Sequence, residues 1–190
     1  LEFPPASQAQ YSNTGYVLLA EIVERVSQQS FTNYISDYIF SPLDMHDSYV
    51  LDSNETIRPN FALNYGETIE VNGHNFFAYG SSGIVSSIED MEKFANSLLN
   101  DEILSASVID VMRSPNGLFN DGQQAYGYGL VVDPSGYDAF FHTGGNDGYQ
   151  SIMFINRESN AQLLILGNGG SRISHGHIMD LITEYYQSND

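Results

Sequence analysis

Four apolar segments in the second half of the chain decide the fold: YGYGLVV at 126–132, YDAFFH at 137–142, YQSIMFI at 149–155 and QLLIL at 162–166. Each is rich in aromatic or β-branched residues and is bounded by polar or glycine-containing stretches, which predicts a strand. Connections this short join antiparallel neighbours, so we expect a meander, with Gly144, Gly145 and Gly148 punctuating its second turn.

The residues on either side of these strands favour helices. In the first predicted helix, 16–26, the apolar residues Leu18, Leu19, Ile22, Val23 and Val26 recur at helical spacing, with Glu21, Glu24 and Arg25 expected outside. Further helices are predicted at 31–39, at 105–113 and at 173–186, and another begins at a capping box formed by Ser87 and Asp90. A short strand and a hairpin turn are predicted at 68–73. Helices, a meander and a closing helix make an α+β chain, one domain or one lobe of a larger one.

Composition excludes several classes of function. Lys plus Arg is 6 against 24 Asp plus Glu, a net charge of −18 over 190 residues, and such a surface repels phosphate backbones, so no nucleic-acid partner is expected. The absence of cysteine excludes disulfides, thiolate metal sites and a cysteine nucleophile. No apolar run reaches the ~20 residues of a transmembrane helix. We expect neither a metal nor a cofactor.

The segment Tyr11-Ser12-Asn13 directly precedes the first predicted helix. A tyrosine hydroxyl there could act as a general base if a nearby cation lowered its pKa, and an asparagine amide could orient a substrate amide. Taken alone, the same residues favour a plain helix N-cap with an aromatic staple.

The segment His142-Thr143-Gly144-Gly145 ends the second predicted strand. Polar residues followed by glycines allow close approach of a substrate, and a backbone N–H could stabilise an oxyanion. A hairpin turn with a solvated histidine is the competing interpretation.

Two other patterns favour ordinary structure. His175-Gly176-His177 offers two metal ligands where zinc needs three or four, so a helix start is the better interpretation. The stretch 167–172 could hold an anion before a helix, but a strand-to-helix turn explains it.

Five segments, in order, resemble one family, the class C β-lactamases, DD-peptidases and related esterases within the serine β-lactamase and penicillin-binding proteins. They are YSNTGYVLL at 11–19, SPLDM at 41–45, SGIVSS with the following DMEKF at 82–94, YGYGL at 126–130 and FHTGG at 141–145. Asp44 stands where the family has glycine, and His142 is the histidine version of the third motif.

This resemblance implies a β-lactamase/transpeptidase-like fold and hydrolysis of an amide or ester (a β-lactam, a D-amino-acid peptide or an ester) through an acyl-serine intermediate. It makes Tyr11 the proton carrier and Asn13 the amide binder, places His142 and Thr143 against the substrate, and gives Gly144 and the Gly145 N–H to substrate and oxyanion binding. The partner is then a small molecule or peptide, and export to the periplasm or outside the cell follows by family analogy.

The chain departs from the family at the nucleophile. Its only lysine is Lys93, and the residue three before it is Asp90, so no S-x-x-K motif exists. We therefore expect 1–190 to be the C-terminal portion of a hydrolase domain, inactive alone and in need of an N-terminal segment or of self-association. A non-catalytic module that binds cell-wall peptides is the alternative. An uncharged His142 would favour esters, amides or peptides over carboxylate-bearing substrates.

Overall fold

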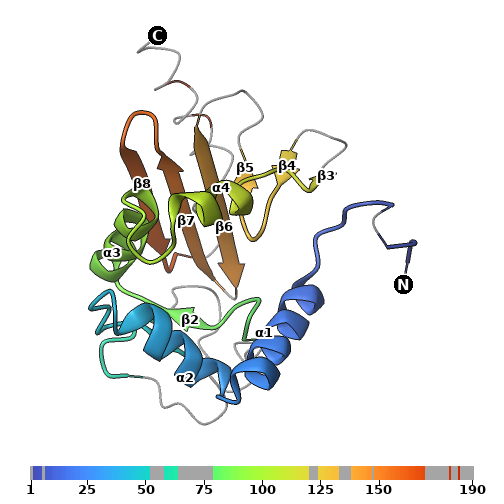
Figure 1. Cartoon of the computed structure of the whole chain (residues 1–190). Coiled ribbons are helices and arrows are strands. Elements are labelled where there is room, and N and C mark those ends of the chain that lie inside the picture. The colour runs from blue at the N-terminus through green and yellow to red at the C-terminus, as the bar shows by residue number, and fades with distance from the viewer. Residues whose placement is uncertain are drawn as a thin grey trace.

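A six-stranded antiparallel sheet in chain order dominates the structure, a computed structural model (Figure 1). The structure describes residues 2–5, 7–51, 58–63, 79–119, 124–132, 138–146 and 148–169, with Asp180 and Glu184. The strands are β3 (Gly117–Phe119), β4 (Gln124–Tyr126), β5 (Val131–Val132), β6 (Ala139–Asn146), β7 (Tyr149–Asn156) and β8 (Ala161–Gly167). The predicted α+β class and antiparallel meander are confirmed.

Two details of the predicted meander are wrong. The segment 126–132 is not one strand, because the Gly127 N–H donates to the Leu130 carbonyl and the chain reverses between β4 and β5. The strand that carries His142 does not end there, because β6 pairs with β7 as far as Asn146 opposite Tyr149. Gly144 and Gly145 therefore lie inside a strand and not in a turn.

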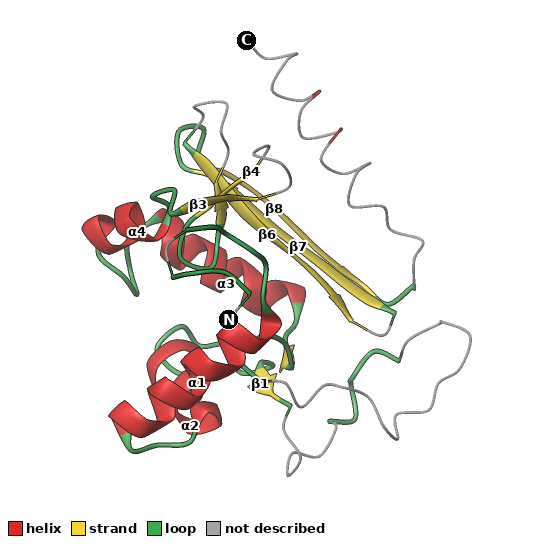
Figure 2. Ribbon diagram, turned by 90° about the vertical axis from the view of Figure 1, so that its right-hand side faces the viewer, coloured by secondary structure: helices red, strands yellow, loops and turns green. Residues whose placement is uncertain are grey.

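Helices α3 (Ile88–Leu99) and α4 (Ala106–Met112) pack on one face of the sheet (Figure 2). Side chains alternate along a strand, so Phe140 and Ile155 point to that face and are fully buried there. They meet Leu98 and Ile109 from the two helices. His142, two residues beyond Phe140, belongs to the same face.

A second layer holds α1 (Asn13–Ser27), α2 (Phe31–Ile35), the π-helical turn η1 (Ser36–Phe40) and the two-stranded sheet of β1 (Tyr49–Val50) and β2 (Ile84–Val85). Its core contains Ala20, Phe31 and Val50. Phe94 of α3 packs against both this core and the sheet core, so one helix ties the layers together. The helices predicted at 31–39, after Ser87 and at 105–113 are confirmed within a residue or two.

The apolar stripe of α1 does not face the core as its spacing predicted. Leu18, Leu19, Ile22 and Val26 are 52% to 80% exposed, whereas Ala20 is buried and Val23 packs on the second core. The helix turns its smallest apolar side chain inward, to the side where the backbone of Gly80 approaches so closely that an added Cβ would lie 2.7 Å from the Ala20 Cβ. An apolar surface on α1 is thus left uncovered by the described residues.

Several predictions lie outside the described residues: the strand and turn at 68–73, most of the closing helix at 173–186, His175 and His177, and the end of the 167–172 stretch. No helix within the described ranges is long and apolar enough to cross a bilayer.

Candidate active site

The start of α1 is held by its N-cap. Ser12 has extended backbone angles, and its hydroxyl accepts a hydrogen bond from the Gly15 N–H at 3.1 Å, satisfying one of the free donors of the first turn. The cap places Tyr11 just before the helix and Asn13 at its first position. The predicted N-cap is therefore real, and it orients the two flanking side chains.

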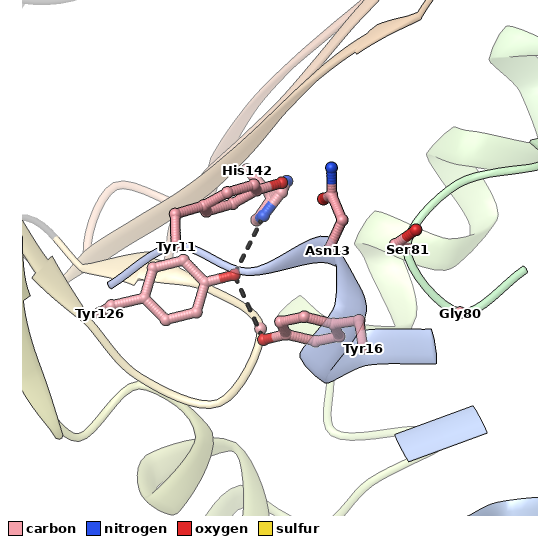
Figure 3. A pocket seen from close by; sticks show the side chains of 8 residues that line it. Tyr11, Asn13, Tyr16, Gly80, Ser81, Tyr126 and His142 are labelled. Carbon is pink, nitrogen blue, oxygen red and sulfur yellow. Dashed lines mark hydrogen bonds between the residues drawn. The ribbon is translucent and has the colours of Figure 1, made fainter. Parts of the chain in front are cut away.

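One cavity of about 200 Å³ collects residues from distant parts of the sequence (Figure 3). Three of them, Tyr11, Asn13 and His142, are residues that the sequence singled out for catalysis. The full lining is Tyr11, Asn13, Tyr16, Gly80, Ser81, Tyr126, Gly129 and His142. The start of α1, the 80–81 turn, the β4–β5 connection and β6 thus form its walls.

His142 is hydrogen-bonded inside this cavity. Its Nε2 lies 3.2 Å from the Tyr126 hydroxyl, and the two rings meet edge to face with centroids 6.2 Å apart. The Tyr126 hydroxyl lies 3.2 Å from that of Tyr16. Burial lowers the pKa of the His142 imidazole below its usual value, and a hydrogen bond with the Thr143 backbone opposes this only in part. Burial thus favours the uncharged form of the histidine.

Thr143, Gly144 and Gly145 continue along β6, opposite Ile152, Ser151 and Gln150 of β7. They are not among the residues that line the cavity. A Cβ at Gly144 would meet the Ser151 hydroxyl, which would have to rotate away to make room. At Gly145 an added Cβ would meet nothing within 4 Å, which leaves the space beside its backbone open.

The turn at Gly80-Ser81 packs tightly against α1. Gly80 has a φ of +93°, and a Cβ there would lie 2.6 Å from the Tyr16 carbonyl oxygen and 2.7 Å from the Ala20 Cβ. Only glycine fits this close approach with a positive φ. The turn sets Ser81 at the edge of the cavity.

The sequence did not single out Tyr16, Ser81 or Tyr126 for the site. Tyr126 and Tyr16 were visible only as parts of the family-like YGYGL and YSNTGYVLL segments. Their convergence depends on the packing of α1 against the edge of the sheet, which no local pattern reports.

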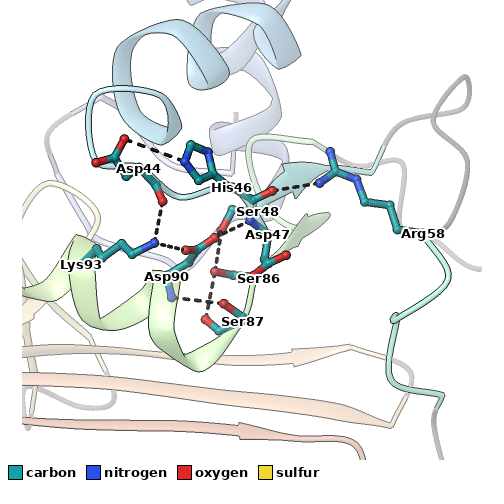
Figure 4. Close-up of polar contacts among 9 residues, drawn as sticks. All are labelled: Asp44, His46, Asp47, Ser48, Arg58, Ser86, Ser87, Asp90 and Lys93. Atoms are coloured by element: carbon teal, nitrogen blue, oxygen red, sulfur yellow. Dashed lines mark hydrogen bonds and ion pairs between the residues drawn. The ribbon is translucent and has the colours of Figure 1, made fainter.

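The only lysine of the chain, Lys93, lies outside the cavity and pairs with Asp90 (Figure 4). Lys93 Nζ lies 2.8 Å from the Asp90 carboxylate and 2.5 Å from the Asp44 carbonyl oxygen, and it does not line the cavity. Asp90 also accepts hydrogen bonds from the Asp47 N–H and the Ser48 hydroxyl. Burial alone would raise the pKa of Asp90, but the hydrogen bonds from Lys93, Ser48 and Asp47 hold it below its usual range.

The predicted capping box at α3 is only half present. The Ser87 hydroxyl accepts from the Asp90 N–H at 3.2 Å, as expected of an N-cap. The Asp90 carboxylate is 1% exposed and points to the 44–48 loop rather than back to Ser87. It ties that loop to the helix. In the part of the chain that the structure describes, no three His, Asp or Glu side chains gather into a metal site.

The profile of one family, described as Beta-lactamase, matches residues 1–181. Penicillin-binding protein 4* of Bacillus subtilis (strain 168) is 30% identical over 186 residues, which cover 87% of this chain and 41% of that protein. The chain thus spans about two fifths of this curated relative.

Solved structures share the fold. D-amino acid amidase from Ochrobactrum anthropi SV3, in complex with D-phenylalanine, superposes with a TM-score of 0.76 at 25% identity, over 99% of this chain and 61% of that one. The octameric penicillin-binding protein homologue from Pyrococcus abyssi gives a TM-score of 0.73 at 26% identity, over 88% of this chain and 40% of that one. The expected β-lactamase/transpeptidase-like fold is confirmed.

Proposed function

This chain belongs to the beta-lactamase family of serine hydrolases, and from that premise we propose that it forms two walls of an acyl-transfer site whose serine nucleophile comes from outside residues 1–190. The reaction is hydrolysis of an amide or ester, such as a β-lactam, a D-amino-acid peptide or an ester, through an acyl-serine intermediate. The observation that carries the proposal is the single cavity that brings Tyr11, Asn13 and His142 together.

Each residue has a role that its chemistry allows. Tyr11 moves the proton of the nucleophile, for which it needs a cation supplied, like the nucleophile, from outside residues 1–190. Asn13, with a donor and an acceptor, holds the substrate amide. The open space at the Gly145 backbone suits an oxyanion that accepts its N–H, while Thr143 and Gly144 border the substrate.

The nucleophile is not supplied by the cavity itself. Ser81 is the serine that lines it, but no lysine or arginine is among the lining residues to activate a hydroxyl. Lys93 is paired with the buried Asp90. We therefore assign the nucleophile to an S-x-x-K serine beyond this chain and expect the chain alone to be inactive.

The exposed stripe of α1 is the surface that such a segment would cover. Leu18, Ile22 and Val26 recur four residues apart and so lie on one face of α1, away from the face that carries the cavity-lining Tyr16. In the isolated chain the same stripe favours self-association. The octameric state of the Pyrococcus abyssi homologue makes association between copies the competing arrangement.

The substrate class follows from the uncharged state of His142. A neutral imidazole attracts a carboxylate far less than an ammonium or guanidinium group does. We infer that the substrate presents an uncharged ester or amide group at this end of the cavity. D-amino acid amidase, one of the structural relatives, acts on an amide, as its name states.

The test is covalent labelling of the protein isolated from its natural source. A fluorophosphonate should label a serine of an S-x-x-K motif outside residues 1–190, which peptide mass spectrometry would locate. Tyr11→Phe should slow labelling by ~10²-fold or more, as expected for loss of a proton carrier. Tyr128→Phe is the matched control, because Tyr11 and Tyr128 are 57% and 59% exposed and only Tyr11 lines the cavity.

Two outcomes would contradict the proposal. Labelling of Ser81, abolished by Ser81→Ala, would place the nucleophile inside this chain. A protein of natural length that binds cell-wall peptide but takes no label would favour the non-catalytic binding module.

A further inference from the structure

The hydroxyl groups of Tyr16 and Tyr126 and the imidazole of His142 form a continuous row across the cavity (Figure 3). The two links are both 3.2 Å long and join α1 to β4 and β4 to β6. A row that connects three separately packed elements holds each ring in one orientation. Nothing in the proposed roles of Tyr11 and Asn13 requires it.

Hydrogen-bond donation along this row can run in one sense only at a time. A phenol has one O–H donor and two acceptor lone pairs, so Tyr126 can donate to one neighbour while it accepts from the other. Burial raises the pKa of Tyr126 well above that of an ordinary tyrosine. Its proton therefore stays on the oxygen and is available to the histidine.

The other side of the imidazole is engaged as well. Its hydrogen bond with the Thr143 backbone favours the protonated ring and is therefore one that the ring donates. A neutral imidazole has one N–H and one lone pair. If the N–H goes to the backbone, Nε2 is left as the acceptor that faces Tyr126.

We propose that Tyr16 and Tyr126 are positioning residues that hold His142 as an uncharged imidazole in a single tautomer, with Tyr16 donating to Tyr126 and Tyr126 donating to Nε2 of His142. Tyr126 acts on the histidine directly and Tyr16 acts through Tyr126. We call this row of Tyr16, Tyr126 and His142 the relay. Its consequence for the substrate rests on the proposed function: an uncharged His142 selects substrates whose group at this end of the cavity carries no charge.

The surroundings of His142 support an uncharged ring. The titratable groups that face it are the phenols of Tyr11 and Tyr16 from the start of α1 and of Tyr126 from β4. On β7 its partner is Met153. None of the described residues that line the cavity is acidic or basic apart from His142 itself, so none of them offers a carboxylate that would stabilise an imidazolium.

The relay can be tested on this chain by long-range proton–nitrogen NMR of the histidine rings, with the His142 signals assigned by their loss in His142→Gln. In the unmodified chain His142 should be in the Nδ1–H tautomer, neutral at pH 7, with a titration midpoint below that of an exposed histidine. In Tyr126→Phe the tautomers should mix and the midpoint should rise by about 0.7 pH unit, the shift expected when one hydrogen bond to the neutral ring is lost.

Tyr16→Phe should give a smaller rise in the same direction, and it tests the relay even if Tyr126→Phe fails to fold. Tyr128→Phe, an exposed tyrosine on the neighbouring connection, should leave the titration unchanged. An Nε2–H tautomer in the unmodified chain, or an unchanged midpoint in both cavity variants, would overturn the proposal. The NMR measurement needs no turnover, so failure of the labelling experiment would refute the proposed function and leave this result standing.

Discussion

Replacing Asp90 should weaken the contact between α3 and the 44–48 loop. Its carboxylate is 1% exposed and accepts from Lys93 at 2.8 Å, the Asp47 N–H at 2.8 Å and the Ser48 hydroxyl at 2.9 Å. Asp90→Asn keeps one oxygen, which can still accept from the loop, but it turns an amide NH₂ toward Lys93. Asp90→Ala removes every acceptor at once.

The magnitude follows from these contacts. Asp90→Asn should lower the free energy of unfolding by about 1.5–3 kcal/mol, the range for hydrogen bonds to a charged group. The Lys93 side chain is 41% exposed, so its share is at most about 1 kcal/mol after solvent screening. Asp90→Ala should cost about 3–5 kcal/mol, because it leaves a buried N–H and hydroxyl without their acceptor.

The pH dependence has a defined sign. The folded state holds the pKa of Asp90 below its unfolded value of about 4. The stabilisation is therefore complete above about pH 4 and is lost as the pH falls through the folded-state pKa. The difference between the native chain and Asp90→Asn should be constant near neutrality and should shrink below about pH 4.

Urea unfolding followed by circular dichroism at a series of pH values measures this difference. Asp110→Asn is the matched control, since Asp110 also pairs with a cation three residues away but its side chain is 59% exposed, and its change should stay within about 0.5 kcal/mol. Equal stability of the native chain and Asp90→Asn at pH 7, or a difference that does not diminish in acid, would refute the reasoning.

Three further substitutions probe other parts of the structure. Gly80→Ala should lower the free energy of unfolding by about 1–3 kcal/mol and distort the cavity, because a Cβ there meets the Tyr16 carbonyl oxygen at a φ of +93°; unchanged thermal unfolding would contradict this. Phe140→Ala should cost about 3–5 kcal/mol in urea unfolding, since the ring is fully buried between the sheet and α3, and a loss under 1 kcal/mol would show that the site collapses. Ile22→Glu on the exposed stripe should reduce self-association, measured by sedimentation velocity, with little change in the free energy of unfolding. A native chain that sediments as a monomer would count against the stripe as a contact surface.

Local patterns in the sequence were sufficient for most of the elements. Spacing and caps predicted α1, α3 and α4, and apolar runs predicted β6, β7 and β8, because both signals depend on residues within a few positions of one another. The same locality explains the errors. The reversal between β4 and β5 is held by the Tyr128 N–H, which donates to the Met112 carbonyl of α4, a contact that no pattern within 126–132 reveals.

The sequence by itself showed that no serine stands three residues before a lysine. It also singled out the candidate residues that stand in short motifs, Tyr11, Asn13 and His142. Tertiary structure alone decided which other side chains join them. Tyr16 and Tyr126 meet across the cavity although they are 110 residues apart, and Lys93 is drawn away to the buried Asp90. Packing also decided that the apolar stripe of α1 is exposed, because periodicity identifies an apolar face but not whether another element covers it.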